Sequence, residues 1–554
     1  MLLGIDVGGT FTDAVIINGS TIISSAKRRT TKDNLMNGIT DALGAVMSGV
    51  DSAQIEQVTL STTVVTNTIV EHKEQPVDLY VVAGPGRNVD DIFPVRPVYL
   101  KGYTDHRGIV VERTDVGGTR QLANMVQSKS GTDLAAVSAK FGVRNPKEEI
   151  DVAQALADTY STISTGSALS GNLNFPRRTI SAYFNSAVAA VFKEFKTAVY
   201  HALETFHITA PVYILKADGG SLPIDTVESI PVETVFTGPA ATVLGLEALR
   251  STKEAHTVAL DIGGTTTDIS LWKQGKPLMT KEGVSIREYP SAVRSFAVTS
   301  VGIGGESAVR YEDGELMVGP ERLGPSVALG GTIPTLGDAL IVLGNAHYGD
   351  EQKAYDAITQ IDTTIDAKIM AQRIVDTAVR VVQQGIDTVV AKENKRPIYV
   401  VSDIVHPDPF VPAQLVIVGG TAASLGPIIG DTLGLPVHIP PDAAVANAIG
   451  AGVANHTMAI TVHVDTKRRT MVVPELGIQD KGSSLRSAQA VEEVAYGLLR
   501  EAAQEQGLVP QGVMPAIETI SVEDFPVVDG WQSMERIITV KVQLKAGVSN
   551  YVES

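Results

Sequence analysis

Two short segments of the chain combine aspartates, paired glycines and threonines in nearly the same order, one at residues 5–16 and the other at 260–271. In each, an apolar run leads into this group of residues and another apolar run follows it. The pattern predicts a β-hairpin whose turn exposes backbone N–H groups, because glycine takes unusual dihedral angles and lets an anion approach closely. The candidate binding residues are Asp6, Gly8, Gly9, Thr10, Thr12 and Asp13 in the first copy, and Asp261, Gly263, Gly264, Thr265, Thr266, Thr267 and Asp268 in the second.

Phosphate is the ligand that this chemistry suits. Threonine hydroxyls add donors to the backbone N–H groups, and a lone carboxylate beside phosphate suits a hydrated magnesium ion. The alternative is that each segment is only a tight hairpin in which Asp and Gly serve turn chemistry. Two near-identical copies far apart in the chain favour the binding interpretation, because paired hairpins that face each other across a cleft can hold the two ends of a polyphosphate.

Two further glycine pairs are candidate binding residues. Gly304 and Gly305 lie in residues 300–307, which predict a loop that leads into a helix, and Gly419 and Gly420 follow a predicted buried strand. Such glycines can admit a nucleotide or simply allow a close contact between a helix and its neighbour. Both interpretations stay open at this point.

A general base is harder to place. Glu71 is a candidate at the end of a predicted helix that begins at the hydroxyl cluster of residues 61–63, and a solvated carboxylate at a helix end is the alternative. The ten histidines are scattered, and no two stand at the spacing of metal ligands on a helix. No Ser-His-Asp arrangement with supporting context is found. The chemistry is therefore assigned to the two aspartate-glycine segments.

Composition excludes several classes of protein. The chain has 554 residues and no cysteine, which rules out disulfides, thiolate catalysis, Fe–S clusters and Cys-based zinc sites. A net charge of −17 argues against a general binder of nucleic acid or of a membrane surface. The N-terminus enters a predicted strand almost at once, and no apolar run is long enough to span a bilayer. We therefore expect a soluble, cytoplasmic protein.

Strand and helix patterns alternate along the chain, which predicts an α/β protein of several domains. Apolar residues recur at helical spacing in residues 181–206 and 365–392, which predicts two long helices. We expect an N-terminal lobe at residues 1–180 with an inserted subdomain at about 84–150, a second lobe at 181–455, and a small α+β domain at 456–554.

The order of these motifs resembles that of the actin, Hsp70 and sugar-kinase superfamily, with its two phosphate hairpins, connecting helices and adenosine segment. Within it, the chain resembles the hydantoinase/oxoprolinase family, specifically the ATP-binding A-type subunit. The segments that carry this resemblance are residues 6–13, 62–67, 237–241 and 261–268, Pro334-Thr335 and Asp338-Ala339. It covers roughly residues 1–455 and leaves the tail unmatched.

The resemblance implies two ribonuclease-H-like α/β lobes with ATP between them. Asp6 and Asp261 would position Mg²⁺ and the attacking group, and the metal and backbone dipoles would stabilise charge on the transferring phosphate. Thr10, Thr12, Thr265 and Thr267 would hold phosphate oxygens, and the residues that would approach the nucleoside are Gly304, Gly305, Gly419 and Gly420.

The same resemblance bears on the reaction. Members of the family use ATP to open cyclic amides such as hydantoins or 5-oxoproline, or to carboxylate ketones, which implies a small cyclic amide as substrate and a B-type partner subunit. The chain departs from the family at residues 419–425, where the usual histidine is missing, and at residues 319–331, where the usual cysteine-containing stretch is missing. Two other functions stay open: an ATP-driven reactivating factor that acts on a partner enzyme, and a small-molecule kinase. Assembly into a homo-oligomer also stays open.

Overall fold

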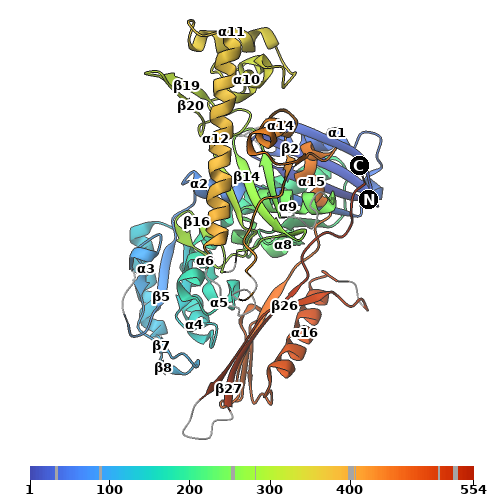
Figure 1. Cartoon of the computed structure of the whole chain (residues 1–554). Coiled ribbons are helices and arrows are strands. Elements are labelled where there is room, and N and C mark those ends of the chain that lie inside the picture. The colour runs from blue at the N-terminus through green and yellow to red at the C-terminus, as the bar shows by residue number, and fades with distance from the viewer. Residues whose placement is uncertain are drawn as a thin grey trace.

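The first aspartate-glycine segment forms the predicted hairpin in the computed structural model of the chain (Figure 1). β1 (Leu2–Val7) pairs antiparallel with β2 (Phe11–Asn18), with Asp6 opposite Asp13. The structure describes residues 1–30, 35–86, 90–250, 256–280, 282–396, 405, 407–509, 512–527 and 535–553.

This hairpin lies inside a six-stranded sheet with the order β12-β11-β4-β1-β2-β3. The side chains of β2 alternate between its two faces, as a strand requires. Ala14 and Ile16 face the core formed with the helices at residues 35–46 and 189–205. Val15 and Ile17 face the opposite way and pack against the helix at residues 446–452. The other members of this layer are β3 (Thr21–Arg29), β4 (Gln57–Thr62), β11 (Val212–Leu215), β12 (Ser221–Pro223), α1 (Leu35–Val46) and α2 (Val64–Val70).

The second aspartate-glycine segment repeats this topology. β13 (Thr257–Ile262) and β14 (Thr267–Lys273) form an antiparallel hairpin with Asp261 opposite Asp268, and β21 (Gln414–Val418) runs parallel to β13 as β4 does to β1. The sheet is completed by β15 (Lys276–Pro277), β18 (Val298–Val301) and β22 (Val437–His438). The two lobes are therefore structural copies, which confirms the predicted two-lobed α/β fold.

Two helices made largely of small residues join the lobes. α9 (Thr237–Ala248) and α15 (Ala446–Gly452) cross between the two sheets (Figure 1). A Cβ atom added at Gly245 would overlap the carbonyl oxygen of Ala446, and one added at Gly450 would overlap the carbonyl oxygen of Ala241. Because only glycine lets two backbones approach so closely, these residues set the separation of the helices and hence of the lobes.

Replacing Gly245 by alanine is expected to destabilise the protein by about 2–3 kcal/mol, because the new methyl group must push α9 away from the backbone of α15. The matched control is Gly497→Ala in α16 (Ala488–Glu505), where an added Cβ meets nothing within 4 Å. That change removes the cost of glycine in a helix and should stabilise the protein by about 0.5–1 kcal/mol. Chemical denaturation of the two variants measures both effects, and equal shifts would contradict the close helix crossing.

An inserted layer extends from the first lobe. Its four strands are parallel, in the order β10-β9-β5-β6, and span residues 78–165. This is wider than the expected 84–150, because β5 pairs with β9 and not with the first sheet. β11 and β12 in turn join the first sheet beyond residue 180. The elements are β5 (Asp78–Val82), β6 (Val98–Tyr99), β7 (Tyr103–Thr104), β8 (Val110–Glu112), α3 (Val116–Ser130), β9 (Leu134–Ala139), α4 (Lys147–Leu156), β10 (Thr162–Thr165) and α5 (Gly166–Leu169).

The long helix expected at residues 181–206 is two helices. α6 (Phe175–Ala187) and α7 (Ala189–Thr205) meet at Val188, whose dihedral angles leave the helical range. The apolar spacing continues through this break, so periodicity alone did not reveal it. By contrast, the helix expected at 365–392 is confirmed as α12 (Ala367–Asn394).

The second lobe carries an extension that protrudes along α12 (Figure 1). It consists of β19 (Val309–Glu312), β20 (Glu315–Val318), α10 (Leu336–Val342) and α11 (Glu351–Ile361). The element that follows the Gly304-Gly305 segment is strand β19, so the prediction of a helix directly after these glycines is wrong. The remaining elements of the body are α8 (Ile224–Val227), β16 (Ser285–Ile286), β17 (Tyr289–Pro290) and α14 (Ala422–Leu433).

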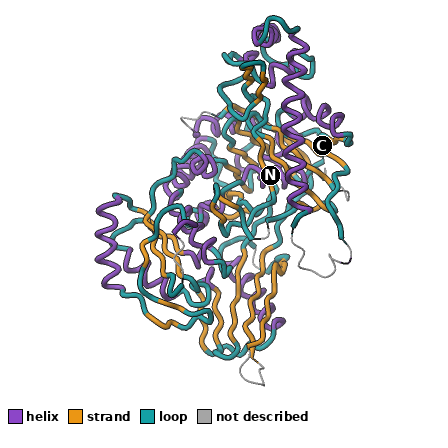
Figure 2. Tube along the Cα trace, turned by 60° about the vertical axis from the view of Figure 1, so that its left-hand side comes forward, coloured by secondary structure: helices purple, strands orange, loops and turns teal. Residues whose placement is uncertain are grey.

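The tail forms the predicted small α+β unit, seen at the bottom of Figures 1 and 2. Its sheet has the order β25-β24-β23-β27-β26, and α16 packs on one face of it. Its strands are β23 (Ala459–Asp465), β24 (Thr470–Val473), β25 (Ile478–Lys481), β26 (Ile517–Val527) and β27 (Glu535–Leu544).

Candidate functional site

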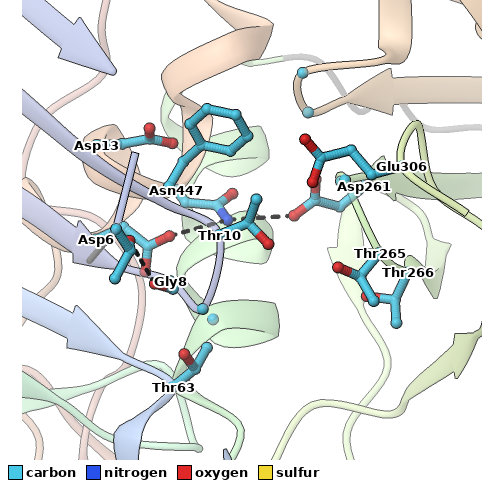
Figure 3. A pocket seen from close by; sticks show the side chains of 18 of the residues that line it. Asp6, Gly8, Thr10, Asp13, Thr63, Asp261, Thr265, Thr266, Glu306 and Asn447 are labelled. Carbon is cyan, nitrogen blue, oxygen red and sulfur yellow. Dashed lines mark hydrogen bonds between the residues drawn. The ribbon is translucent and has the colours of Figure 1, made fainter. Parts of the chain in front are cut away.

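A cavity of about 850 Å³ opens between the two repeated hairpins (Figure 3). It is lined by both lobes and by the start of the helices that join them. Most of the residues that the sequence singled out border it: Asp6, Gly8, Gly9, Thr10, Asp13, Asp261, Gly263, Gly264, Thr265, Thr266, Asp268, Gly305, Gly419 and Gly420. The expectation that the two hairpins face each other across a cleft agrees with this geometry.

The two hairpin turns have the same geometry and nearly touch. The N–H of Gly8 donates to the carbonyl of Phe11 at 3.0 Å, and the N–H of Gly263 donates to the carbonyl of Thr266 at 3.0 Å. A Cβ atom on Gly264 would lie 3.5 Å from Cγ2 of Thr10 in the other lobe. Within the described ranges, the N–H groups at the turn tips, those of Gly9 and Gly264, make no backbone hydrogen bond. The turns are therefore suited to receive an anion between them.

The base of the cavity is organised by Asn447, which the sequence analysis did not find. Its side-chain amide points to both catalytic candidates, with Nδ2 3.4 Å from Oδ2 of Asp6 and 3.3 Å from Oδ2 of Asp261 (Figure 3). The hydroxyl of Thr242 donates to Oδ2 of Asp261 at 2.6 Å and lies 2.8 Å from Oδ1 of Asn447. One aspartate from each lobe thus meets at side chains of the two crossing helices, α9 and α15.

Burial makes the carboxylates of the cavity costly to ionise. It raises the pKa of Asp6, and the charge of Asp261 adds to this effect, against hydrogen bonding from Ser61 and the charge of Lys27. Burial likewise raises the pKa of Asp13 to about 7, although Lys27 donates to its Oδ2 at 2.6 Å. Such carboxylates gain from a nearby cation.

The donor set fits a divalent cation. Among the described residues, Oδ1 of Asp6 and Oδ1 of Asp13 are buried without a hydrogen-bond partner, and a cation would satisfy such oxygens. No group of three or more acidic or histidine side chains in the described ranges is arranged to hold a metal alone. Mg²⁺ binds through one or two carboxylates and completes its shell with water and phosphate oxygens, so Asp6 is a suitable ligand for it, and Asp261, which also borders the cavity, stays the predicted second ligand.

Asp268 provides a test of this electrostatic description. Burial and the charge of Asp261 raise its pKa to about 7, against a hydrogen bond from Ser300. The folded state therefore holds a proton that the unfolded state releases above about pH 4, and stability falls as pH rises from about 4 to 7. We expect Asp268→Asn to raise the melting temperature by about 2–4 °C at pH 8 and to leave it unchanged near pH 4. Asp431→Asn, an exposed position on α14, is the control, and a gain that is independent of pH would contradict the prediction.

Two of the predicted phosphate-binding hydroxyls lie elsewhere. Thr12 and Thr267 are fully buried. The hydroxyl of Thr12 pairs with that of Thr30 at 3.0 Å, and the hydroxyl of Thr267 donates to the carbonyl of Ile303 at 2.7 Å. Neither residue lines the cavity. The reason is strand alternation, because the aspartate that follows each threonine faces the cavity and the threonine must face away.

Glycines of both pairs pack closely against the second hairpin. A Cβ atom on Gly304 would lie 2.5 Å from the backbone of Gly264, and Gly304 does not line the cavity. Gly305 donates its N–H to the carbonyl of Gly263 at 3.0 Å. A Cβ atom on Gly419 would lie 2.5 Å from Oδ1 of Asp261. These glycines are needed for close packing, and the expected contact with a nucleoside stays a prediction for the three that border the cavity.

Several charged residues of the cavity were also missed. These are Lys27, Glu306 and Arg322. The cavity is also lined by Glu71, the candidate base that the sequence did indicate, and its carboxylate pairs with Lys73 at 2.5 Å. The role of Glu71 as a base stays a prediction. For Asn447 a signal existed in the sequence, since it is the one polar residue in the helical segment Ala446–Gly452. Lys27, Glu306 and Arg322 gave no such signal, because they lie outside the repeated segment, although Lys27 pairs with Asp13 only 14 positions away and Arg322 with Glu306 only 16 positions away.

Comparisons with known proteins agree with this site. The hydantoinase/oxoprolinase profile matches residues 178–460, and the profile of the hydantoinase/oxoprolinase N-terminal region matches residues 2–160. The chain belongs to the hydantoinase/oxoprolinase family. The predicted resemblance is thereby confirmed, and both hairpins lie inside the matched regions.

Individual relatives are distant. Caprolactamase subunit alpha from Pseudomonas jessenii is 26% identical over 382 residues, which cover 62% of this chain and 54% of that protein. Acetophenone carboxylase gamma subunit from Aromatoleum aromaticum is 25% identical over 541 residues, 86% of this chain and 70% of that one. The crystal structure of ATP-dependent caprolactamase from Pseudomonas jessenii superposes with a TM-score of 0.69 at 20% identity, covering 98% of this chain and 87% of that one. This superposition confirms the fold.

The chain thus spans about half the length of caprolactamase subunit alpha. None of the helices among the described residues is long and apolar enough to cross a membrane.

Proposed function

We propose that the chain is the ATP-binding subunit of an enzyme that uses ATP hydrolysis to open a small cyclic amide such as a hydantoin, 5-oxoproline or a lactam. The observation that carries this proposal is the pair of matching hairpins with one aspartate from each lobe on either side of Asn447. Membership of the hydantoinase/oxoprolinase family and the names of the relatives support it. We further propose that the enzyme is cytoplasmic.

The residues of the cavity have distinct tasks in this proposal. The backbone N–H groups of the two turns bind the polyphosphate, one turn from each lobe. Asp6 and Asp261 hold Mg²⁺, which neutralises phosphate charge when it is bound. Asn447 keeps the two aspartates apart and oriented, because its amide contacts both. Gly305, Gly419 and Gly420 border the part of the cavity proposed for the nucleoside.

The proposed chemistry proceeds in three steps. The carbonyl oxygen of the amide attacks the γ-phosphorus of ATP, a new P–O bond forms and the bond to ADP breaks, and loss of the N–H proton leaves a phosphorylated imidate. Water then adds to the activated carbon, and the C–N bond of the ring breaks with protonation of the nitrogen, which leaves an acyl phosphate. A second water hydrolyses the acyl phosphate to a carboxylate and inorganic phosphate. The two lobes contribute by placing the acceptor and the γ-phosphate together and excluding competing water.

We also propose a partner subunit of the B type. Two of the relatives are named as subunits, and the chain spans only 54% of one of them.

The test is Mg²⁺-dependent ATP turnover, measured for the chain alone and with a B-type subunit, against hydantoin, 5-oxoproline, ε-caprolactam and acetophenone. Strong stimulation by a cyclic amide, with one phosphate released per ring opened, supports the proposal. Stimulation by the ketone alone would replace ring opening with carboxylation. A stable phosphorylated product would identify a kinase, and slow turnover that only a protein stimulates would identify a reactivating factor.

A further inference from the structure

The edge strand of the first lobe reaches across the cavity to the second lobe. β3 ends in three cationic residues, Lys27, Arg28 and Arg29. Because side chains alternate along a strand, Lys27 and Arg29 share one face and Arg28 points to the other. The ammonium group of Lys27 and the guanidinium group of Arg29 both lie over the ring of Phe11, at 5.3 and 5.7 Å from its centroid. The ring therefore holds both cations beside the first hairpin.

Both cations have partners in the second lobe. Nη2 of Arg29 lies 3.2 Å from Oε1 of Glu306, and Nζ of Lys27 donates to the carbonyl oxygen of Ala444 at 3.1 Å. Glu306 directly follows the glycine pair behind the second hairpin, and Ala444 directly precedes α15. One strand thus makes two polar contacts between the lobes on either side of the cavity.

Glu306 is a firmly held partner. Its N–H donates to the carbonyl of Gly264 at 2.6 Å, which ties it to the turn of the second hairpin. Its other carboxylate oxygen accepts from Nε of Arg322 at 2.5 Å, and its side chain is only 9% exposed. Arg29, by contrast, is 47% exposed. A half-exposed ion pair contributes little to stability and can break and reform, so the pair is suited to open with the lobes.

We propose that Glu306 is a positioning residue which, through Arg29, latches the first phosphate hairpin to the second. The latch acts on the lobes without a nucleotide, since both partners belong to this chain. Its effect on catalysis rests on the proposed function, because phosphoryl transfer requires the two turns to be at a fixed separation. Loss of either partner widens the range of lobe separations around the α9–α15 crossing and leaves each hairpin intact.

The first experiment measures the separation of the lobes directly in the full chain. Because the chain has no cysteine, spin labels can be attached at Ile23→Cys on β3 and Thr432→Cys on α14, one exposed position in each lobe. Without nucleotide, we expect one narrow distance distribution, which becomes longer and broader in Arg29→Ala and in Glu306→Gln. The matched controls are Arg28→Ala, on the other face of β3, and Glu321→Gln, whose side chain pairs with Arg310. An unchanged distribution in Arg29→Ala and Glu306→Gln would overturn the latch.

The second experiment separates positioning from a merely structural role. We expect Arg29→Ala and Glu306→Gln each to lower kcat/KM for ATP by about 10-fold, and the double variant to lower it no further, because both remove the same contact. The controls should stay within about 2-fold of the unmodified chain. Additive losses, or losses without a change in the distance distribution, would overturn the proposal. Absence of ATP turnover in the unmodified chain, both alone and with a B-type subunit, would instead reject the proposed function, and the distance measurement would still decide on the latch.

Discussion

Replacing Asp261 by asparagine is expected to lower ATP turnover by about 10³-fold while the protein stays folded. Asparagine has the size of aspartate and keeps a carbonyl oxygen that can accept from Thr242, which donates to Oδ2 of Asp261 at 2.6 Å. The substitution removes the negative charge and one candidate cation ligand. Continuous detection of released phosphate, at saturating Mg²⁺ and substrate, measures the effect.

The control for Asp261→Asn is Asp431→Asn, which makes the same chemical change at an exposed position on α14. Melting temperatures of both variants show whether the fold is retained. Turnover within about 3-fold of the unmodified chain in Asp261→Asn would mean that this carboxylate only supports structure, and the assignment of the metal site would then be wrong.

The internal repeat explains why so much of the site could be predicted. Each hairpin is a local structure, so its strands, its turn and the register that places one aspartate opposite the other follow from a few consecutive residues. The structure has this register in both copies, Asp6 with Asp13 and Asp261 with Asp268. The two copies then differ in the partner of the second aspartate, which is Lys27 for Asp13 and Ser300 for Asp268.

The missed features depend on contacts that are distant in the chain. Asn447 reaches Asp6 across 441 positions, and Glu306 reaches Arg29 across 277. No local pattern encodes such pairs. The pairing of β5 with β9, which enlarges the inserted layer, is of the same kind.

Strand alternation, in contrast, was readable from the sequence. Once Asp13 and Asp268 are assigned to the cavity, the neighbouring Thr12 and Thr267 must face away from it. A consistent use of this rule would have removed both threonines from the predicted phosphate ligands, while Thr10 and Thr265, which lie in the turns and outside the strands, would have remained.

Asn447 is the second position at which a single substitution should abolish function. Asn447→Asp would place a third carboxylate where the amide now donates to Asp6 and Asp261, at 3.4 and 3.3 Å. Two attractive contacts become repulsive, because three carboxylates then lie within contact distance of one another. We expect turnover to fall by about 10²–10³-fold.

The same substitution should make stability depend on pH in a predictable direction. Repulsion from the new carboxylate raises the pKa of Asp6, already raised by burial, further above its unfolded value, so the protein loses stability as pH rises from about 4 towards 8. We expect the melting temperature of Asn447→Asp to match that of the unmodified chain near pH 4 and to lie several degrees below it at pH 8, where saturating Mg²⁺ should restore part of the loss.

Two further variants isolate the cause. Asn447→Ala removes the amide without adding charge, so its loss of stability should grow less steeply with pH than that of Asn447→Asp, because only the contact that lowers the pKa of Asp6 is lost and no carboxylate is added. Asn18→Asp makes the same chemical change at the exposed last residue of β2, beside the turn, where aspartate is tolerated, and should change neither property. If the melting temperatures of Asn447→Asp and Asn447→Ala changed alike across the pH range, the amide would not be separating two charged aspartates. Asp6 and Asp261 would then have to be assigned to separate tasks.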